Sequence, residues 1–595
     1  MSDIEKKAEL LFEVSWEVCN KVGGINTVIK SKTSKILESY NDHDYIAVGP
    51  YFHDKATEEF EEVPTPKEFE KKCKELETEG IQIHFGKWLI KGSPFTILID
   101  FNNYWYKLNE IKQKLWENFS ISSIRSGYDY DEPLVWSYAV GRVIQCLANN
   151  KKTVVQCHEW LSGVTLLYLK INKVKISTVF TTHATILGRT LSSNNVNLYA
   201  VLDKINPDQE AYKYNIEAKH SVEKQSAINS DIFTTVSEIT GIEAEKLLGR
   251  KPDVILPNGL DIQKFPTFEE LSVQHNIFKN KIKEFLKYYF FPYYPLDLDN
   301  TLIYFLAGRY EYRDKGIDVF INSLSKLNAM MKKSKSKKNI VAFIWVPANA
   351  QSIDPHLLQN KAIYDEIQHS INDNNTSIKN KIMNNLLSNK NINEKSIFSE
   401  SFLFETKKRL KRFKKVGTPE LSTHHLYDKN DQIVKTLYSS GLDNMEDDPV
   451  KVIFYPIYLT GSDGLLDLTY YECMQGSHLG VFPSFYEPWG YTPLEAAALG
   501  VSSVTTDLAG FGRHIYKECV DKEIPGVFVL KRDKKTDQQI TDSLAKFMFK
   551  FSKFSKQDRV KNKLIARNMA AKADWKFLID NYIIAHNKAF DKTYK

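Results

Sequence analysis

The chain has 595 residues, of which 42% are apolar and 26% are charged, as in ordinary globular proteins. A chain of this length is too long for one hydrophobic core, so we expect two or three domains and exclude a small binding module. Lys and Arg number 80 against 74 Asp and Glu. This balance provides no general polyanion-binding surface and argues against a nucleic-acid partner.

Cysteine spacing and apolar runs indicate the compartment. The six cysteines show no CxxC spacing and predict neither a zinc site nor a disulfide framework. The first residues carry charges where a signal peptide would be apolar, and no apolar run is long enough to span a membrane. We therefore expect a cytoplasmic protein with no membrane partner.

In chain order, the predicted elements are short apolar strands, each followed by a helical pattern. The first series lies at residues 10–16, 44–50, 95–101, 153–160, 177–184 and 231–238, and the second at 301–310, 340–347, 450–458, 480–485 and 501–507. This alternation predicts two doubly wound α/β domains with a ligand cleft between them, beyond the carboxyl ends of the strands. We expect an N-terminal domain at 1–265, a C-terminal domain at 266–565, and a final helix at 566–595 that packs back on the first domain.

Residues 352–450 interrupt the second series with a composition rich in Asn, Lys and Ser. Their apolar residues recur at helical spacing, which favours a helical insertion with one apolar face over disorder. The residues at this spacing are Ile367, Ile371, Ile378 and Ile382. Such a face usually meets another subunit, although the basic run TKKRLKRFKK could also be a solvated surface.

The most informative stretch runs from Gly480 to Gly500, GVFPSFYEPWGYTPLEAAALG, and predicts a strand, a loop and a helix. We expect Thr492 to be the helix N-cap. Gly490 allows a ligand close to the backbone, and the amides of Tyr491 and Thr492 lie at the positive end of the helix dipole, so the motif can hold a diphosphate.

Two acids in this stretch, Glu487 in the loop and Glu495 in the helix, can address different parts of one nucleotide sugar. The alternative is a helix start with ordinary acids in its first turn. The segment GRYEYRDKG places Arg309 and Lys315 after another strand, where two cations can neutralise a leaving diphosphate without a metal. Surface ion pairs are the alternative for these two residues.

Two weaker patterns lie in the N-terminal half. Lys21, Gly23 and Gly24 form a loop before a helix, which fits an anion-binding loop or an ordinary tight turn. Past two further strands lie His158, Glu159, His183 and Arg189, which fit a sugar or phosphate contact or a structural histidine cluster. Three Asp-x-Asp pairs are common by chance in such a chain, so we predict no metal site.

These motifs together resemble the eukaryotic-type glycogen synthases along the whole chain. The matching strings are NKVGGINTVIKSK, GKWLIKGSP, HEW, TTHATILGR, FTTVSEITGIEAEKLLGRKPDVILPNGLD, LDNTLIYFLAGRYEYRDKGID, VKVIFYP and YEPWGYTPLEAAALG. The resemblance implies two Rossmann-like domains of the GT-B type, with the acceptor on the N-terminal and the nucleotide sugar on the C-terminal domain. It also implies transfer of glucose from UDP-glucose to the non-reducing end of an α-1,4-glucan, with retention of configuration and no metal cofactor.

The resemblance also implies roles for individual residues. Those at the reacting bond are Glu487, His183, Arg189, Arg309 and Lys315. Glu487 would contact the donor glucose, and His183 and Arg189 would line the reacting sugar. Arg309 and Lys315 would stabilise the departing UDP. Those that bind substrate are Lys21, Gly23, Gly24, His158, Glu159, Tyr470, Gly490, Tyr491, Thr492 and Glu495. Among them Tyr470 matches a tyrosine that stacks on uracil, with Tyr471 beside it as the alternative register, and Glu495 matches a glutamate that holds the ribose.

Regulation is where the sequence departs from many relatives, which bind glucose 6-phosphate through an arginine-rich helix. Here the corresponding run is DRVKNKLIARNMAAKADW, in which Lys563 and Arg567 remain with Arg559 and Lys561. His275 and His478 match allosteric-site histidines, whereas Glu269 replaces another and would repel a phosphate. We therefore expect at most a remnant of that site, with weak or absent activation.

The resemblance further implies a homotetramer built through the insertion and a glycogenin-like primer protein as a partner. Two other functions remain open. One is an inactive glucan-binding or assembly protein of the same fold, against which the intact acids and cations argue. The other is a related glucosyltransferase that uses ADP-glucose, because no motif specifies the base. For the reaction we favour attack guided by the diphosphate on the same face over a covalent intermediate on Glu487.

Overall fold

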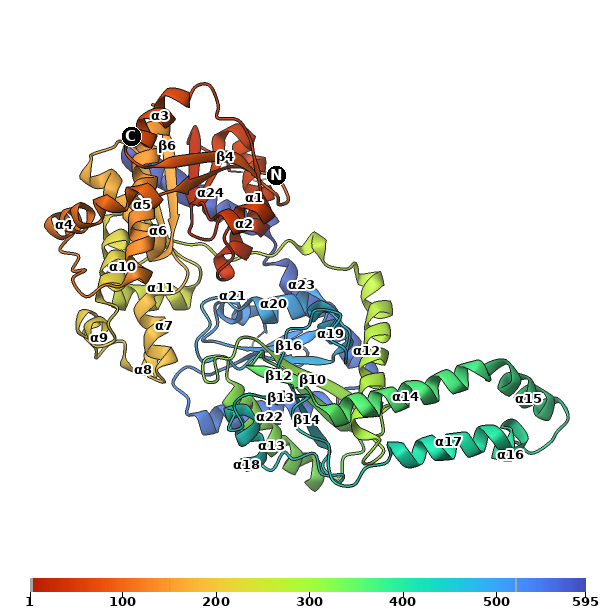
Figure 1. Cartoon of the computed structure of the whole chain (residues 1–595). Helices are drawn as coiled ribbons and strands as arrows, with labels where there is room; N and C mark the ends of the chain where they lie inside the picture. Colours follow the sequence, from red (N-terminus) through yellow and green to blue (C-terminus); the bar gives the residue numbers. More distant parts are fainter. Residues whose placement is uncertain (1–3, 149, 520–521) are drawn as a thin grey trace.

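The computed structural model describes residues 4–148, 150–519 and 522–595 and contains two α/β domains (Figure 1). The N-terminal domain is built on a nine-stranded sheet of order β3-β4-β5-β2-β1-β6-β7-β8-β9. The C-terminal domain is built on a six-stranded sheet of order β14-β11-β10-β15-β16-β17. Both sheets are parallel except at β3 and β4, so the predicted fold class of two doubly wound domains is confirmed.

The strands of the first sheet are β1 Leu10–Val14, β2 Tyr45–Pro50, β3 Phe60–Glu62, β4 Gln82–Trp88, β5 Phe95–Asp100, β6 Thr153–His158, β7 Ser177–Thr182, β8 Ile232–Thr235 and β9 Val254–Ile255. Its helices are α1 Gly24–Asp44, α2 His53–Glu59, α3 Glu70–Thr78, α4 Leu108–Phe119, α5 Tyr128–Leu147, α6 Glu159–Ile171, α7 Ile186–Ser193, α8 Leu198–Val201, α9 Pro207–Lys213, α10 Glu217–Asn229 and α11 Glu238–Leu247. Central strands are buried on both faces and therefore read as continuous apolar runs.

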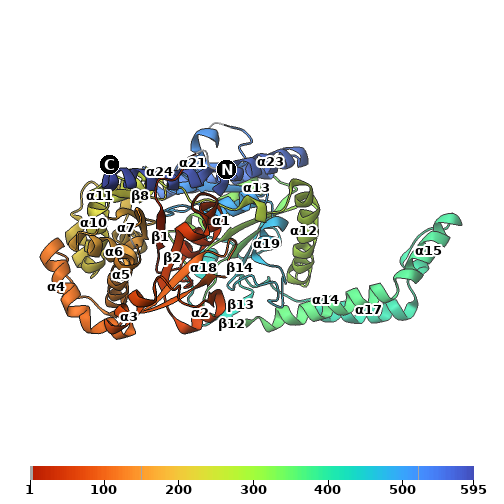
Figure 2. The same ribbon diagram turned by 90° about the horizontal axis from the view of Figure 1, so that it is seen from above.

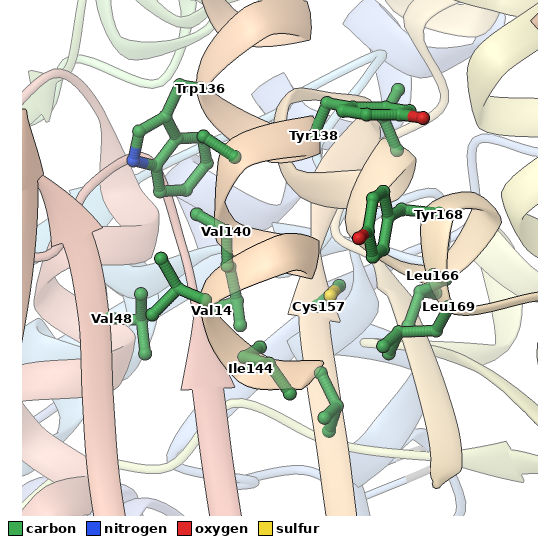
Figure 3. Close-up of a cluster of buried hydrophobic side chains, with 14 of the residues drawn as sticks. Val14, Val48, Trp136, Tyr138, Val140, Ile144, Cys157, Leu166, Tyr168 and Leu169 are labelled. Atoms are coloured by element: carbon green, nitrogen blue, oxygen red, sulfur yellow. The ribbon is translucent and has the colours of Figure 1, made fainter. Parts of the chain in front are cut away.

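A large apolar core lies between this sheet and its helices. Figure 3 shows part of it, in which Trp136 and Val140 of α5 point toward Val14 and Val48 of β1 and β2. All four side chains are fully or almost fully buried. This packing makes the sheet a rigid support for the loops at its carboxyl edge.

The strands of the second sheet are β10 Thr301–Ala307, β11 Asn339–Trp345, β14 Val450–Tyr455, β15 Leu479–Val481, β16 Ser502–Thr506 and β17 Val527–Leu530. Its helices are α12 Phe268–Phe290, α13 Ile317–Lys333, α18 Gln432–Ser439, α19 Tyr470–Gly476, α20 Tyr491–Ala498, α21 Gly510–Cys519, α22 Asp537–Ser552 and α23 Lys556–Ala571. The predicted strand at 480–485 is too long, because Pro483 has no amide hydrogen for the ladder and the chain turns away. The strands β3, β4, β9 and β17 were not predicted, since each is short or only partly buried.

The last helix, α24 Trp575–Tyr594, returns to the first domain and packs along β6, β7 and α1. The helix before it, α23, packs instead on α20 of the second domain. The second crossing between the domains lies beside the first, where the Leu260 amide donates to the Ala573 carbonyl at 2.8 Å and Trp575 covers Gly259. The two connections between the domains therefore lie next to each other.

The insertion forms an arm that projects far from the body (Figures 1 and 2). It consists of α14 Pro355–Asp373, α15 Asn375–Leu387, α16 Glu394–Ile397 and α17 Glu400–Phe413, so the predicted helices are confirmed. The predicted range 352–450 is too wide, because the hairpin β12 Ala350–Ile353 with β13 His424–Leu426, and α18 beyond it, belong to the body. No helix in the described part of the chain is both long and apolar enough to cross a bilayer.

Candidate active site

The sequence-predicted residues gather where the two sheets present their carboxyl ends to each other. In the first sheet, β6 ends at His158 and β7 at Thr182, so His183 and α7 follow directly. In the second sheet, residues 308–316 follow β10 and residues 482–490 follow β15. Hydrogen bonds from α7 and α11 to these two loops bring the four strand ends to one domain boundary.

The two predicted cations lie on either side of Glu311, and one of them also contacts Glu487. Lys315 Nζ lies 2.5 Å from Glu487 Oε2. Arg309 Nη2 lies 2.8 Å from Glu311 Oε1, and Lys315 Nζ is 4.0 Å from the other oxygen of Glu311. The Arg309 side chain is 68% exposed, so it can reach an arriving anion. The structure thus brings Arg309, Lys315 and Glu487 together.

The loop that carries Glu487 leads into α20, whose first turn was predicted to hold a diphosphate. The prediction of Thr492 as N-cap is wrong, because α20 begins at Tyr491 and Gly490 is its N-cap with φ 105°. That backbone conformation is left-handed, and a Cβ there would also lie 3.3 Å from Glu487 Cγ, so glycine is required. Within the described chain the amides of Tyr491 and Thr492 donate to no acceptor, which leaves the positive end of α20 available to an anion.

Glu495 projects from the first turns of α20 toward the two tyrosines at the start of α19. Tyr471 Oη donates to Glu495 Oε1 at 2.8 Å and Tyr470 Oη to Oε2 at 3.4 Å. Burial raises the pKa of Glu495 to about 7, although both hydroxyl groups oppose the shift. Both tyrosines therefore contact the same acid, and Tyr470 is the more enclosed of the two.

His183 is the end of a buried polar chain. Its Nε2 lies 3.0 Å from Nδ1 of His158, whose Nε2 lies 2.8 Å from Glu13 Oε1. Glu13 also pairs with the buried Lys32, and although burial opposes it, Lys32 and His158 hold the pKa of Glu13 well below its usual range. Burial, followed by the charges of its neighbours, lowers the pKa of His183 well below its ordinary value.

The hydrogen bonds from Glu13 to His158 and from His158 to His183 determine which nitrogen of each ring carries the proton. A carboxylate only accepts, so His158 donates from Nε2 to Glu13 and accepts at Nδ1. His183 then donates from Nε2 to His158, and its Nδ1 remains an acceptor. A neutral His183 in this tautomer can accept a hydrogen bond from a sugar hydroxyl.

Glu159 supports the backbone on which His183 lies. Its Oε1 accepts from the amides of His183 and Ala184 at 2.8 and 3.1 Å, and its own φ of 65° is unusual for a residue with a side chain. Burial raises the pKa of Glu159 to about 7, although Arg189 opposes the shift. Burial lowers the pKa of Arg189, but interactions with nearby acidic groups outweigh it and raise the pKa overall; these groups are those of Glu159, Tyr486, Glu311 and Glu243. Arg189 therefore lies within electrostatic range of both domains.

The Gly-Gly loop at the start of α1 is held by Glu17. The Oε2 atom of Glu17 accepts from the amides of Gly23 and Asn26, both at 2.9 Å. A Cβ on Gly24 would meet nothing within 4 Å, and Lys21 is exposed, so this side of the loop is open. Burial raises the pKa of Glu17, and the charge of Arg189 partly offsets the shift, which places the loop near Arg189.

The candidate allosteric residues lie elsewhere: His275 is on α12, His478 directly precedes β15, and Lys563 and Arg567 are on α23. The rings of His275 and His478 are 5.4 Å apart, and the charges of Lys563, Lys279 and Arg559 act on both. Burial, followed by the charges of Lys279 and Arg559, lowers the pKa of Lys563 to about 7. The predicted fourth member, Arg567, instead donates to the Ala498 carbonyl at the end of α20.

Several residues of the site were missed by sequence reasoning. They are the acids and the base that hold the predicted residues in place: Glu13, Glu17, Lys32, Glu243, Glu311 and Asp314. Glu311 and Asp314 lie inside the motif GRYEYRDKG, so the motif itself carried the signal. Glu13 lies 145 residues from His158 and Glu243 lies 243 residues from Tyr486, so no local spacing reveals these two contacts.

A family model described as glycogen synthase matches residues 13–595, nearly the whole chain. The chain belongs to the glycogen synthase family. A glycogen [starch] synthase of Dictyostelium discoideum is 36% identical over 591 residues, covering 98% of this chain and 67% of that protein. The liver glycogen [starch] synthase of Mus musculus is 35% identical over 574 residues, covering 96% and 81%.

Among solved structures, the catalytic domain of starch synthase IV from Arabidopsis thaliana superposes with a TM-score of 0.52 at 14% identity, covering 98% of this chain and 100% of that chain. At this identity the likeness concerns the fold, and it agrees with two Rossmann-like domains of the GT-B type. The family match and the relatives confirm the predicted glycogen synthase function, that of a glycosyltransferase.

Proposed function

We propose that this chain transfers glucose from UDP-glucose to the non-reducing end of an α-1,4-glucan, with retention of configuration and without a metal. The observation that carries the proposal is the contact of Lys315 with Glu487, 2.5 Å apart, beside the amides at the start of α20, which donate to no acceptor among the described residues. This arrangement offers positive charge to a diphosphate and an acid to the attached sugar.

The charges explain how the reaction is accelerated. Breaking the anomeric bond places positive character on the sugar and negative charge on the diphosphate. Arg309, Lys315 and the start of α20 would stabilise the departing UDP, and such preorganised groups lower a barrier more than most other devices. Arg189 and the Nδ1 acceptor of His183 would then orient the glucose from the other domain.

Retention leaves two routes, and the surroundings of Glu487 favour one. Glu487 contacts Lys315 directly, and a carboxylate committed to an ammonium group is a weakened nucleophile. We therefore propose that the diphosphate guides the acceptor hydroxyl onto the same face of the sugar. Trapping a glucosyl-enzyme on Glu487, detected by mass spectrometry after a 2-fluoroglucosyl donor, would contradict this route.

For the donor base, Tyr470 and Tyr471 supply aromatic surface near Glu495, and Glu495 supplies an acceptor for ribose hydroxyl groups. The direct test is incubation with glycogen and labelled UDP-glucose or ADP-glucose, in the presence of EDTA. We expect incorporation from UDP-glucose that EDTA does not reduce. Incorporation only from ADP-glucose would assign the other donor, and none from either would favour an assembly protein.

The arm supports a proposal about assembly, in which four copies associate through α15 to α17. Its tip exposes Met383, Leu386, Leu387 and Phe404, the last two by 80% and 69%. A monomer rarely leaves so many large apolar side chains together in solvent. Light scattering after size exclusion should give four chains per particle, and Leu387→Glu should lower that number.

We further propose a cytoplasmic protein that extends glucan begun by a glycogenin-like primer. The support is the family itself, in which glycogen is the product that the relatives' names state. Supplying the purified chain with UDP-glucose alone should give no polymer, whereas adding short maltooligosaccharides should. Polymer formation without any acceptor would contradict the need for a primer.

Weak activation by glucose 6-phosphate also remains our proposal. Of the four predicted residues, Arg567 is bound to the Ala498 carbonyl, and both histidines have pKa values lowered by burial and nearby cations. Lys563, with its pKa near 7, is only partly charged at neutral pH. We expect less than twofold activation at pH 8, and a severalfold rise in rate would overturn the proposal.

A further inference from the structure

Two hydrogen-bonded links join the ends of α7 to the two loops of the C-terminal domain that carry Glu487 and Lys315, and one of them runs through Glu243 of α11. At the start of α7, Glu243 Oε1 accepts from the hydroxyl of Thr185, which is the N-cap, and from Tyr486 Oη at 3.0 Å. At its last turn, Ser192 Oγ donates to Asp314 Oδ1. Tyr486 and Asp314 are the residues immediately before Glu487 and Lys315.

The same two loops are also joined to each other. The Asp314 carbonyl accepts from the amides of Phe485 and Tyr486 at 2.8 and 3.3 Å. Behind them, the Gly510 amide at the start of α21 donates to the Glu487 carbonyl at 3.1 Å. The reacting groups of the C-terminal domain therefore form one unit, and α7 is attached to that unit at both ends.

The contact is buried and shaped for these polar groups. Glu243, Ser192 and Tyr486 are at most 5% exposed, and Asp314 is 6% exposed. A Cβ on Gly188 of α7 would lie 2.1 Å from Glu243 Oε1, so only glycine leaves room for the carboxylate. Apolar residues surround Glu243 and Tyr486. Leu187 of α7 is one of them and belongs to the same buried cluster as Phe485.

A purely stabilising contact would not need this arrangement. Apolar side chains of similar volume hold two surfaces together without the desolvation that a buried carboxylate brings. Hydrogen bonds add direction, and the two links at the ends of one helix determine its position along and across the boundary. The helix so positioned carries Arg189, and it follows His183 within three residues.

We propose that Glu243 and Asp314 are positioning residues, which through Tyr486 and Ser192 bring His183 and Arg189 into register with Glu487 and Lys315 across the two domains. This inference rests on the proposed function. Neither residue touches substrate in this scheme. A misplacement of about 1 Å between catalytic groups can reduce a rate by about a hundredfold, so such registration has a measurable effect.

The test uses the full-length protein with three substitutions that each remove one hydroxyl. Tyr486→Phe and Ser192→Ala each break one of the two links. Tyr199→Phe is the matched control, because Tyr199 packs edge-on against Phe485 at the same boundary, 6.2 Å between ring centroids, and no hydrogen bond of its hydroxyl is found in the described chain. Glu243→Gln is the conservative variant, since an amide oxygen still accepts from Thr185 and Tyr486.

We expect kcat to fall about tenfold or more in Tyr486→Phe and in Ser192→Ala, as for loss of one hydrogen bond to a buried charged group. The Kd for UDP, measured by calorimetry, should stay unchanged, because the groups proposed to bind UDP lie in the C-terminal domain. Amide exchange in residues 184–195 should become faster. Glu243→Gln and Tyr199→Phe should keep kcat within about twofold.

Wild-type kcat and unchanged exchange in Tyr486→Phe and Ser192→Ala would overturn the inference. So would an equal loss in Tyr199→Phe, which would show general loosening of the boundary. A wild-type protein that transfers no glucose would instead contradict the proposed function. In that case the exchange comparison would still decide whether the two links hold α7 in place.

Discussion

Lys315 is the side chain on which the proposed chemistry depends most directly, because it lies in the loop after β10 and contacts Glu487. In the proposed mechanism two cations stabilise the leaving diphosphate, and Lys315→Ala removes one of them while Arg309→Ala removes the other. We expect each to lower kcat by about 10² or more, the scale of losing one charge-stabilising donor.

The matched control for Lys315 is Lys333→Ala, at the exposed end of the following helix α13. It removes the same group far from the loop, so its kcat should equal that of the wild type. Steady-state assays with glycogen give all three values. Normal rates in folded Lys315→Ala or Arg309→Ala would remove the basis of the proposed mechanism.

The raised pKa of Glu495 predicts how the stability of the protein depends on pH. Burial raises its pKa from 4.5 to about 7, so the folded state binds the proton more tightly than the unfolded chain does. Stability from this group is therefore fully present below pH 4.5 and is lost as pH rises through about 7. Glu495→Gln lacks this loss, so its free energy of unfolding relative to the wild type should rise by up to about 3 kcal/mol between pH 5 and pH 8.

Urea denaturation of both proteins at several pH values measures this difference. Glu472→Gln would be a poor comparison because Glu472 caps α19. Glu523→Gln, whose side chain is 80% exposed, is the better control and should show no comparable pH-dependent difference. Parallel curves for Glu495→Gln and the wild type would show that Glu495 ionises normally.

At the scale of elements, the arm separates stability from assembly. Neither α15 nor α16 buries a side chain within the chain. Replacing residues 375–398 by a short Gly-Ser linker should therefore change Tm by less than about 2 °C, as for changes that remove no buried contact. The proposed tetramer should dissociate, and light scattering with calorimetry checks both results. A large fall in Tm with assembly retained would show that the tip stabilises the subunit instead.

The central strands could be predicted because burial on both faces produces continuous apolar runs, as in β10 and β11. The edge strand β3 and its neighbour β4 could not, since both contain exposed residues and pair antiparallel. Glu487 and Lys315 could be predicted because each belongs to a local motif. Their contact with each other, 172 residues apart, and the link from Glu243 to Tyr486 depend on domain packing that no local spacing reveals.

At the scale of the whole molecule, the end of the chain stabilises the N-terminal half of the site. His586 of α24 donates from Nε2 to Gln156 Oε1 at 2.9 Å and accepts at Nδ1 from the Tyr40 hydroxyl at 3.1 Å. Lys32 Nζ lies 4.1 Å from the centre of the Tyr582 ring. Lys32 pairs in turn with Glu13, which orients His158. The last helix is therefore connected to the predicted catalytic histidine through buried groups.

Tyr582→Ala should test this connection. The side chain is fully buried, so its removal should lower the free energy of unfolding by about 3–5 kcal/mol, the range for large aromatic side chains. It should also lower kcat, because the cavity left by the ring would expose Lys32 and Glu13 to water. Glu13 would then hold the tautomer of His158, and through it that of His183, less firmly. Phe577→Ala, at a position 58% exposed on the same helix, should change neither quantity.

Because α24 covers β6 and β7, amide exchange in Tyr582→Ala should quicken in those strands and stay unchanged in β14. Equal effects of the two substitutions, or exchange that quickens first in the C-terminal domain, would show that α24 does not act through the first sheet.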